Sequence, residues 1–286
     1  MKTAVLGHIE WGEFALVERV PEPGDIVHAR ETFELPAGGA AVAAVQIARL
    51  GGNCVFMTAA GSDQRGDETI KGLEARGLRV EATRRDTDQR RVFVFLDDEG
   101  ERTITTIGER LGPEVTDPLP WDELHGVDAI YFTAGNAETL RAARAAKMVV
   151  ASIRARQALK SAGVQVDVLV ASANDKGETY VRGEIEPHPR WVVRTDGARG
   201  GTLETEDGKV TEWSSDPPSS EKVDSYGAGD TFAGGLTYAL ARGFPIEMAI
   251  SFAAFCGASS VRGRGPYAAH VSPEELQAWE ETNGIA

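Results

Sequence analysis

The chain has 286 residues, of which 42% are hydrophobic and 26% are charged, and its formal net charge is −14. This length and composition are typical of a globular protein with one large domain, or one domain with a small appendage. The acidic balance argues against a nucleic-acid-binding surface, because phosphate contacts need clustered Lys and Arg.

In the first 110 residues the sequence pattern predicts strands and helices that do not alternate regularly along the chain. The first apolar run is too short for a signal peptide. Short β-rich runs bounded by Gly, Pro or Asp predict strands at 3–7, 14–20, 25–36 and 54–61, and a hairpin at 90–108. Apolar periodicity predicts helices at 38–52 and 66–78, each ending at a glycine.

From residue 127 onward the pattern changes to alternating strands and helices. Strands are predicted at 127–135, 147–152, 166–172 and 190–197, and a second hairpin at 201–213. Helices are predicted at 136–146, 153–163, 174–183, 227–243 and 245–261. The most apolar later stretch, Leu236 to Val261, contains Arg242, Pro245 and Glu247, so no membrane span and no membrane partner are expected.

This alternation predicts an α/β fold with a parallel sheet covered by helices on both faces, and a ligand site beyond the carboxyl ends of the strands. The segments 11–35 and 90–107 do not fit the alternation, so we expect them to form a small β-sheet lid. The remaining segments, 1–10, 36–89 and 108–286, would form the large domain.

The glycine-rich run Gly227-Ala228-Gly229 precedes Asp230 where the helix at 227–243 begins. The first amides of a helix have no backbone partner and attract anions, and glycines allow close approach. An ionised Asp230 beside these amides can accept a proton from a hydroxyl. An anion cradle next to a base suits phosphoryl transfer to an alcohol. Taken alone, the run is equally consistent with an N-capping aspartate after a turn.

The longer run "DSYGAGDTFAGGLT" (224–237) resembles the C-terminal signature of the ribokinase-like carbohydrate kinases, the phosphofructokinase B family. "PAGGAAVAAVQIARLGG" with "AAGSDQRGDETIKGLEARGL" is similar to the N-terminal signature region, and "VVRTDGARGG" to the nucleotide loop. The resemblance implies a three-layer α/β/α, Rossmann-like ribokinase fold with a β-sheet lid. It also implies ATP as phosphoryl donor, Mg²⁺, and a sugar-like acceptor.

The resemblance also implies roles for residues that match the family's motifs. Asp230 falls on the catalytic base, and Gly227, Ala228 and Gly229 fall on the anion hole. The nucleotide would contact Thr195, Gly197 and Gly200, with the adenine near Ala254 to Ala258. Asp224 and Ser225 fall where many members bind a monovalent cation such as K⁺.

The metal motif departs from the family's Asn-x-x-Glu. The matching register gives Ser172-x-x-Asp175, with Asn174 beside it and Glu178 one helical turn further on. If 174–183 is a helix, Asp175 and Glu178 lie on one face and can organise Mg²⁺ through waters. An ordinary acidic first turn explains Glu178 equally well.

The residues expected to bind the acceptor differ from the family's motifs even more than the metal motif does. Gly12 stands where sugar-binding members carry Asp, and the glycine pair Gly38-Gly39 is followed by Ala43 where they carry Asn. Glu10 is the substitute partner for sugar hydroxyls, and Trp11 a ring to stack on, although a surface glutamate and a packing tryptophan are as consistent with the sequence. Two missing partners predict a changed acceptor, such as an unusual sugar, a polyol derivative or a nucleoside.

The leading hypothesis is therefore an ATP-dependent, cytoplasmic kinase for a sugar or sugar-like molecule, with a nucleoside kinase of the same family as alternative. A non-catalytic ligand-binding or regulatory protein on this fold remains open. A dinucleotide-dependent oxidoreductase is less consistent, because no G-x-G-x-x-G follows the first strand. The lid strands would allow a homodimer.

Overall fold

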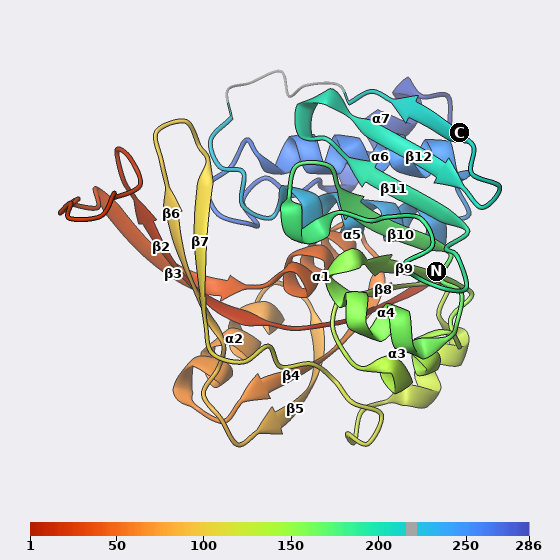
Figure 1. The fold of residues 1–286 in the computed structure, drawn as a ribbon, viewed down its shortest axis with the longest axis horizontal. Helices are drawn as coiled ribbons and strands as arrows, with labels where there is room; N and C mark the ends of the chain where they lie inside the picture. Colours follow the sequence, from red (N-terminus) through yellow and green to blue (C-terminus); the bar gives the residue numbers. More distant parts are fainter. Residues whose placement is uncertain (216–221, 286) are drawn as a thin grey trace.

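A computed structural model describes residues 1–215 and 222–285 of the chain. Within these residues, nine strands form one sheet in the order β13-β12-β11-β10-β9-β8-β1-β4-β5 (Figure 1). All neighbours from β5 to β11 are parallel, and β12 and β13 add an antiparallel hairpin at one edge. The strands are β1 (Lys2–Leu6), β4 (Asn53–Gly61), β5 (Arg79–Arg85), β8 (Ala129–Phe132), β9 (Met148–Ser152), β10 (Val168–Ser172), β11 (Trp191–Thr195), β12 (Gly201–Thr205) and β13 (Val210–Trp213).

The two faces of this sheet are buried against separate hydrophobic cores, because successive residues of a strand point to opposite faces. In β1, Ala4 and Leu6 belong to one core, and Val5 belongs to the other. The first core is shared with α3 (Ala137–Ala143) and α4 (Arg156–Ala162). The second is shared with α1 (Gly39–Arg49), α2 (Gln64–Glu74), α5 (Ala228–Ala241), α6 (Ile246–Ser260) and α7 (Pro273–Thr282). The molecule is thus a three-layer α/β/α structure, as the sequence predicts.

A second sheet of four strands projects from this body, at the left of Figure 1. In the described residues its order is β3-β2-β6-β7, with β2 (Glu10–Leu16), β3 (Glu31–Ala37), β6 (Arg91–Leu96) and β7 (Arg102–Ile107). Phe14 of β2 stacks on Phe33 and meets the ring of Tyr226 edge-on, with centroids 5.0 Å apart. Because Tyr226 lies just before α5, this cluster joins the small sheet to the entrance of that helix.

Most predicted elements are confirmed, including both hairpins. The helix predicted at 174–183 is wrong: that segment contains only a 3-10 turn, Lys176–Glu178. Gly177 and Gly183 disfavour a helix there, and Gly183 has a left-handed φ of 88°. Asp175 caps the turn by accepting from the Gly177 amide at 2.8 Å. The acidic pair is therefore not presented on an α-helical face.

Two elements were missed by the sequence reading. Strand β5 has the polar sequence RVEATRR, which fits a sheet edge paired only with β4 but gives no alternating apolar signal. Helix α7 begins with a capping box in which Ser272 and Glu275 bond to each other's amides. That four-residue signal was present in the sequence.

Both cysteines, Cys54 and Cys256, are buried free thiols. In residues 1–215 and 222–285, no helix combines the length and the apolar character needed to cross a bilayer.

Candidate active site

The polar residues of interest lie where consecutive strands of the large sheet end. The order of these strands reverses at β1, which has β4 on one side and β8 on the other. In open parallel sheets such a reversal leaves a crevice beyond the carboxyl ends of the strands. The residues that follow these ends are His8 and Glu10 after β1, Thr133 after β8, Arg154 after β9, Asp175 and Glu178 after β10, and Asp196 and Gly197 after β11.

Helix α5 begins at this edge with unpaired amides. Gly227 has a left-handed φ of 80°, and its carbonyl accepts from the Thr231 amide at 2.8 Å. Among the described residues, the amides of Gly229 and Asp230 have no hydrogen-bond partner. A Cβ added at Gly229 would have no heavy atom within 4 Å, so the space at this residue's Cβ position is open. Such a helix start is suited to an anion.

The Asp230 carboxylate lies against the start of α1. A Cβ built on Gly39 would be 2.3 Å from Asp230 Oδ1, so a larger residue at that position would displace the carboxylate. Gly38 has φ 100°, and a Cβ there would meet the backbone of His8 and Ile9 at 3.0–3.2 Å. The two glycines therefore bring the α1 start, the segment after β1 and Asp230 together.

The pKa values of two buried tyrosines, Tyr131 and Tyr226, show which carboxylates lie near them. Burial raises the pKa of Tyr131, and the charges of Asp230 and Glu178 raise it further. Burial likewise raises the pKa of Tyr226, with added contributions from Glu10 and Asp230. Asp230 and Glu178 therefore both lie near Tyr131, and Asp230 and Glu10 both lie near Tyr226.

Glu10 is buried, at 6% exposure, and accepts from Arg90 Nε at 2.6 Å. Burial raises the pKa of its carboxyl, against the opposing effect of Arg90. Trp11 lies on the other face of β2 and donates its indole N–H to Glu34 at 2.7 Å. The backbone amide of Glu10 therefore lies next to Gly38, whereas Trp11 is paired with Pro36 of β3 and its indole is bonded to Glu34.

The predicted nucleotide residues are also neighbours. Ser172 and Thr195 are opposite each other in the β10–β11 pair, and the Ala173 amide donates to the Thr195 carbonyl. Gly197 and Gly200 have left-handed φ values of 56° and 92°. A Cβ on Gly200 would be 2.1 Å from the Trp213 carbonyl oxygen, so the loop passes tightly over β13.

This loop is joined to α5 and α6 by packing. Trp213 stacks on Phe232 of α5, with centroids 5.7 Å apart. A Cβ on Gly257 of α6 would lie 3.2 Å from the Ala228 carbonyl oxygen. Ala254 is buried and Ala258 is half-buried on the same helix. The stretch predicted for adenine thus lies next to the α5 entrance.

Asp175 and Glu178 converge on Arg154 rather than on a helix face. Glu178 forms an ion pair with Arg154, and the Asp175 carboxylate is 3.8 Å from the same guanidinium. Burial raises the pKa of Glu178, Arg154 opposes this, and Asp230 adds to it. Two carboxylates with a compensating cation have the donor set for a largely hydrated Mg²⁺. In the described residues, no group of three or more His, Cys, Asp or Glu side chains is placed to hold a metal directly.

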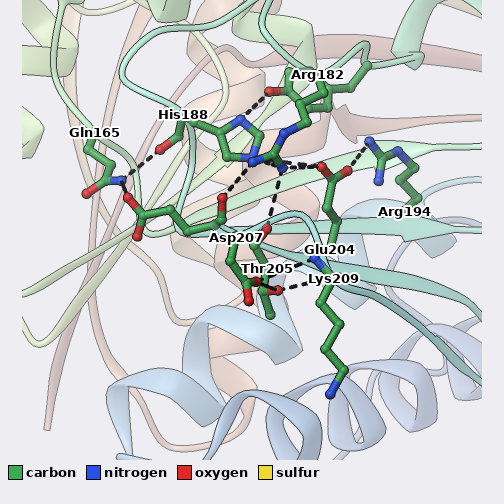
Figure 2. Close-up of polar contacts among 10 residues, drawn as sticks. Gln165, Arg182, His188, Arg194, Glu204, Thr205, Asp207 and Lys209 are labelled. Carbon is green, nitrogen blue, oxygen red and sulfur yellow. Dashed lines mark hydrogen bonds and ion pairs between the residues drawn. The ribbon is translucent and has the colours of Figure 1, made fainter.

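A polar network fixes the segment that follows Glu178 (Figure 2). Glu204 of β12, 5% exposed, accepts from Arg194 at 2.8 Å and pairs with Arg182. Arg182 also bonds His188 at 2.9 Å, and Gln165 donates to the His188 carbonyl at 2.7 Å. These bonds hold the stretch from Arg182 to His188 on the sheet, so the preceding turn with Asp175 and Glu178 is tethered at its far end.

The Asp224 carboxylate has its oxygens occupied by backbone amides, from Tyr226 at 2.8 Å and Gly265 at 2.7 Å. Burial raises its pKa, and these two hydrogen bonds oppose the rise. The Ser225 amide donates to the Gly100 carbonyl of the small sheet. Both residues therefore shape the approach to α5.

Several site residues were missed by the sequence reading. Arg154, Arg110, Arg90 and His8 lie among the predicted residues, yet none belongs to the motifs quoted above. Arg154 lies two residues after the end of β9, and His8 lies two residues after the end of β1. A charged residue at the carboxyl end of a predicted parallel strand was the available signal.

Comparison with known proteins agrees with this geometry. Residues 2–272 match the family model described as pfkB family carbohydrate kinase. The ATP-dependent ribose-1-phosphate kinase of Halopiger xanaduensis is 26% identical over 278 residues, which cover 91% of each chain.

Among solved structures, ribokinase from Thermotoga maritima has a TM-score of 0.78 at 22% identity, covering 98% of this chain and 99% of its own. Arabidopsis thaliana ribokinase complexed with ribose and ATP has a TM-score of 0.76 at 19% identity, covering 97% of both chains. These similarities establish the ribokinase fold. With the family match across nearly the whole sequence, the chain belongs to the pfkB family of carbohydrate kinases and is a phosphotransferase with an alcohol group as acceptor.

Proposed function

We propose that the protein transfers the γ-phosphoryl group of ATP to a hydroxyl of a sugar or sugar-like molecule, with Asp230 as general base. The single observation that carries this proposal is the position of Asp230. Its carboxylate lies against Gly39, at the edge where the strands end, and beside the unpaired amides at the start of α5.

In the proposed reaction, the acceptor hydroxyl donates its proton to the Asp230 carboxylate as its oxygen attacks the γ-phosphorus. The bond between that phosphorus and the bridging oxygen of ATP breaks, and ADP leaves with the bonding electrons. A base contributes by orienting the hydroxyl and removing its proton as charge develops.

The backbone amides at Gly227, Ala228 and Gly229 supply the anion hole. Preorganised amides stabilise negative charge on the moving phosphoryl group without reorganising during the reaction. Gly227 supports this role because its left-handed φ turns the chain into the helix without a side-chain cap.

Thr195, Gly197 and Gly200 would hold the nucleotide phosphates and ribose, with Ser172 and Asn174 beside them. The adenine would lie against Ala254 and Ala258 of α6. Asp175 and Glu178 would hold Mg²⁺ through waters, and the metal would neutralise charge on the ATP phosphates. The Asp224 and Ser225 segment is our proposed location for a monovalent cation.

The segments 11–35 and 90–107 are proposed to act as a lid domain over the acceptor. The edge strand β7 is exposed along its whole length, including Ile104 and Ile107. An unpaired edge of this kind invites strand pairing, so a homodimer through the lid sheet is part of the proposal. Light scattering after size exclusion tests it, and a monomeric mass at micromolar concentration would overturn it.

The variant Asp230→Asn tests the base. We expect kcat to fall roughly 10²–10⁴-fold while ATP binding, measured by thermal shift, is retained. Asp122→Asn is the matched control, since Asp122 is an exposed residue in the turn that precedes β8, at the opposite end of the sheet. ADP release should be measured over sugars, sugar phosphates, polyols and nucleosides. Full activity in Asp230→Asn would disprove the assigned base.

The same panel separates catalysis from mere ligand binding. Mg²⁺-dependent ADP release with any acceptor excludes a non-catalytic regulatory role, and the best acceptor decides between sugar and nucleoside. Glu178→Gln should raise the Mg²⁺ concentration needed for half-maximal rate. An unchanged Mg²⁺ requirement would remove Glu178 from the metal site.

A further inference from the structure

Arg110 is a half-buried cation whose hydrogen-bond partners are all neutral. Its Nη2 donates to His8 Nδ1 at 3.0 Å and to the Thr133 carbonyl at 3.2 Å, and Nη1 donates to the Arg154 carbonyl. Its Nε is buried and has no hydrogen-bond partner. Within residues 1–215 and 222–285, no carboxylate lies within 4.0 Å of this guanidinium, since none of their ion pairs includes it. Removing an arginine from water without a counter-charge is costly.

His8 orients this guanidinium and adds no charge of its own. Burial lowers the pKa of His8 well below its usual value, and the neighbouring Arg110 lowers it further, so the ring is neutral. Because Nδ1 accepts from Arg110, the ring proton is on Nε2, which lies 3.6 Å from Glu10. His8 thereby links Arg110 to the predicted acceptor residue Glu10.

Two further arginines surround Arg110. Burial lowers the pKa of Arg110, and the like charges of Arg154 and Arg90 lower it further, while the Glu10 carboxylate opposes them from a longer distance. Arg90 forms an ion pair with Glu10, and Arg154 with Glu178, so among the described residues Arg110 is the member of the three without an ion pair of its own. This local excess of positive charge contrasts with the net negative charge of the chain, which has 30 basic and 44 acidic residues.

A cavity of about 270 Å³ opens beside this cluster. It lies beyond the carboxyl ends of β8 and β9, and both Arg110 and Arg154 line it, together with Thr133, Gly135, Asn136 and Gln157. Glu114 also lines it, but that side chain is exposed and lies 3.9 Å from Arg85. The volume is close to the lower end of the range for small-molecule pockets, roughly 300–1,000 Å³.

We propose that the acceptor is a sugar that already carries a phosphate group, and that this phosphate binds in the cavity against Arg110 and Arg154. This inference rests on the proposed kinase function and names its acceptor class. A phosphate dianion supplies the counter-charge that Arg110 lacks, through charge-assisted and potentially bidentate hydrogen bonds. It also accounts for the loss of neutral hydroxyl partners at Gly12 and Ala43, because an ionic anchor replaces them.

The chemical step is unchanged by this assignment. A free hydroxyl at the other end of the sugar loses its proton to Asp230 and attacks the γ-phosphorus of ATP. The products are ADP and a sugar that carries two phosphate groups. The anchoring phosphate forms and breaks no covalent bond, so Arg110 acts in binding and positioning.

Matched acceptor pairs test the proposal: ribose with ribose 1-phosphate, and fructose with fructose 6-phosphate, with gluconate as a carboxylate arm. We expect kcat/KM to be about 10–100-fold higher for a phosphorylated acceptor than for its parent sugar. Arg110→Gln should raise KM for that acceptor by a similar factor, while KM for ATP changes less than about twofold. Arg110→Lys, which keeps the charge, should restore part of the loss.

The matched control is Arg141→Gln. Arg141 likewise donates to backbone carbonyls, those of Ala162 and Ser161, but it is exposed on α3. This control should leave the acceptor KM unchanged. A wild-type enzyme that prefers the neutral sugars or gluconate, or an Arg110→Gln variant that keeps the full preference for phosphate, would overturn the proposal and leave the kinase function standing.

Calorimetry without ATP separates failure of the two proposals. Fructose 6-phosphate and ribose 1-phosphate are titrated into wild-type protein and into Arg110→Gln. Binding that the variant loses supports the phosphate site even if no acceptor yields ADP, an outcome that would reject the kinase reaction alone. Absence of binding by either sugar phosphate to the wild type rejects the phosphate site.

Discussion

Gly39 and Asp230 are in direct contact across the entrance of α5: a Cβ on Gly39 would lie 2.3 Å from Asp230 Oδ1 and 2.9 Å from its carboxyl carbon. The first residue of α1 therefore sets where the carboxylate of α5 can lie. The catalytic proposal depends on this contact, because the base must be held where an acceptor hydroxyl meets the phosphoryl group.

The variant Gly39→Ala should displace Asp230 and lower kcat by about 10–100-fold, because a shift of the order of 1 Å at a catalytic group has effects of this size. Circular dichroism should show an intact fold, since alanine favours the helix that begins at this residue. Steady-state kinetics with the best acceptor is the measurement. Gly126→Ala is the control, because a Cβ there meets only the Lys2 ammonium, at 3.8 Å; equal kcat in the two variants would argue against the positioning role.

Packing of α1 on α5 gives a second prediction. A Cβ on Gly234 would lie 2.7 Å from the Ala43 carbonyl oxygen, so the two helices cross at backbone contact. Gly234→Ala should lower the free energy of unfolding by about 1–3 kcal/mol, as overpacking does. Gly229→Ala, in the same helix with open space at its Cβ, should not lower it. Urea unfolding of both variants decides, and equal midpoints would contradict the close crossing.

The network in Figure 2 predicts a dependence of stability on Glu204. Glu204→Gln removes the carboxylate that faces Arg182 and Arg194 and should lower the free energy of unfolding by about 1.5–3 kcal/mol. Glu212→Gln changes an exposed side chain on the neighbouring strand β13, outside the network, and its effect should stay within about 0.5 kcal/mol. Chemical unfolding of the two variants is the test; a Glu204→Gln effect as small as that of the control would mean that the network contributes little.

Stability should fall with decreasing pH partly because of His270. This side chain is buried beside Thr231 and Tyr267, and burial lowers its pKa to about 3. Between that value and about 6.5, the unfolded state binds more protons than the folded state, so the free energy of unfolding rises with pH. The contribution is present above about pH 6.5 and is lost as the pH falls toward 3. The buried neutral His8 acts in the same direction.

His270→Gln should therefore reduce the slope of unfolding free energy against pH, by at most about 1.4 kcal/mol per pH unit. Urea unfolding at pH 7.5 and 5.5 measures it, with the exposed His28→Gln as control for the substitution itself. A slope in His270→Gln that equals the wild-type slope would mean that the imidazole titrates alike in the folded and unfolded states.

The sequence is sufficient to predict a feature when the residues that form it are neighbours in the chain. The glycine-rich entry and Asp230 occupy adjacent positions, so one stretch predicts both the helix start with free amides and the carboxylate beside it. Hairpins and buried strands were predicted for the same reason, since a turn and its alternating flanks are neighbours in the chain. The helix prediction for 174–183 is wrong because the acidic and polar residues of this segment resemble a helical turn. Its glycines and the long-range hydrogen bonds of Arg182 and His188 determine its path instead.

The fold class, the family and the position of the predicted base can be read from the sequence, because each depends on a pattern of adjacent residues. The folded chain is needed to show that Arg154 and Glu178 lie near Asp230, and that Arg110 lies near Glu10. These residues follow different strands, and the order of parallel strands is set by the packing of both sheet faces rather than by local sequence. The positive charge on the acceptor side therefore arises only when the strands are packed side by side and their following residues meet at one edge of the sheet.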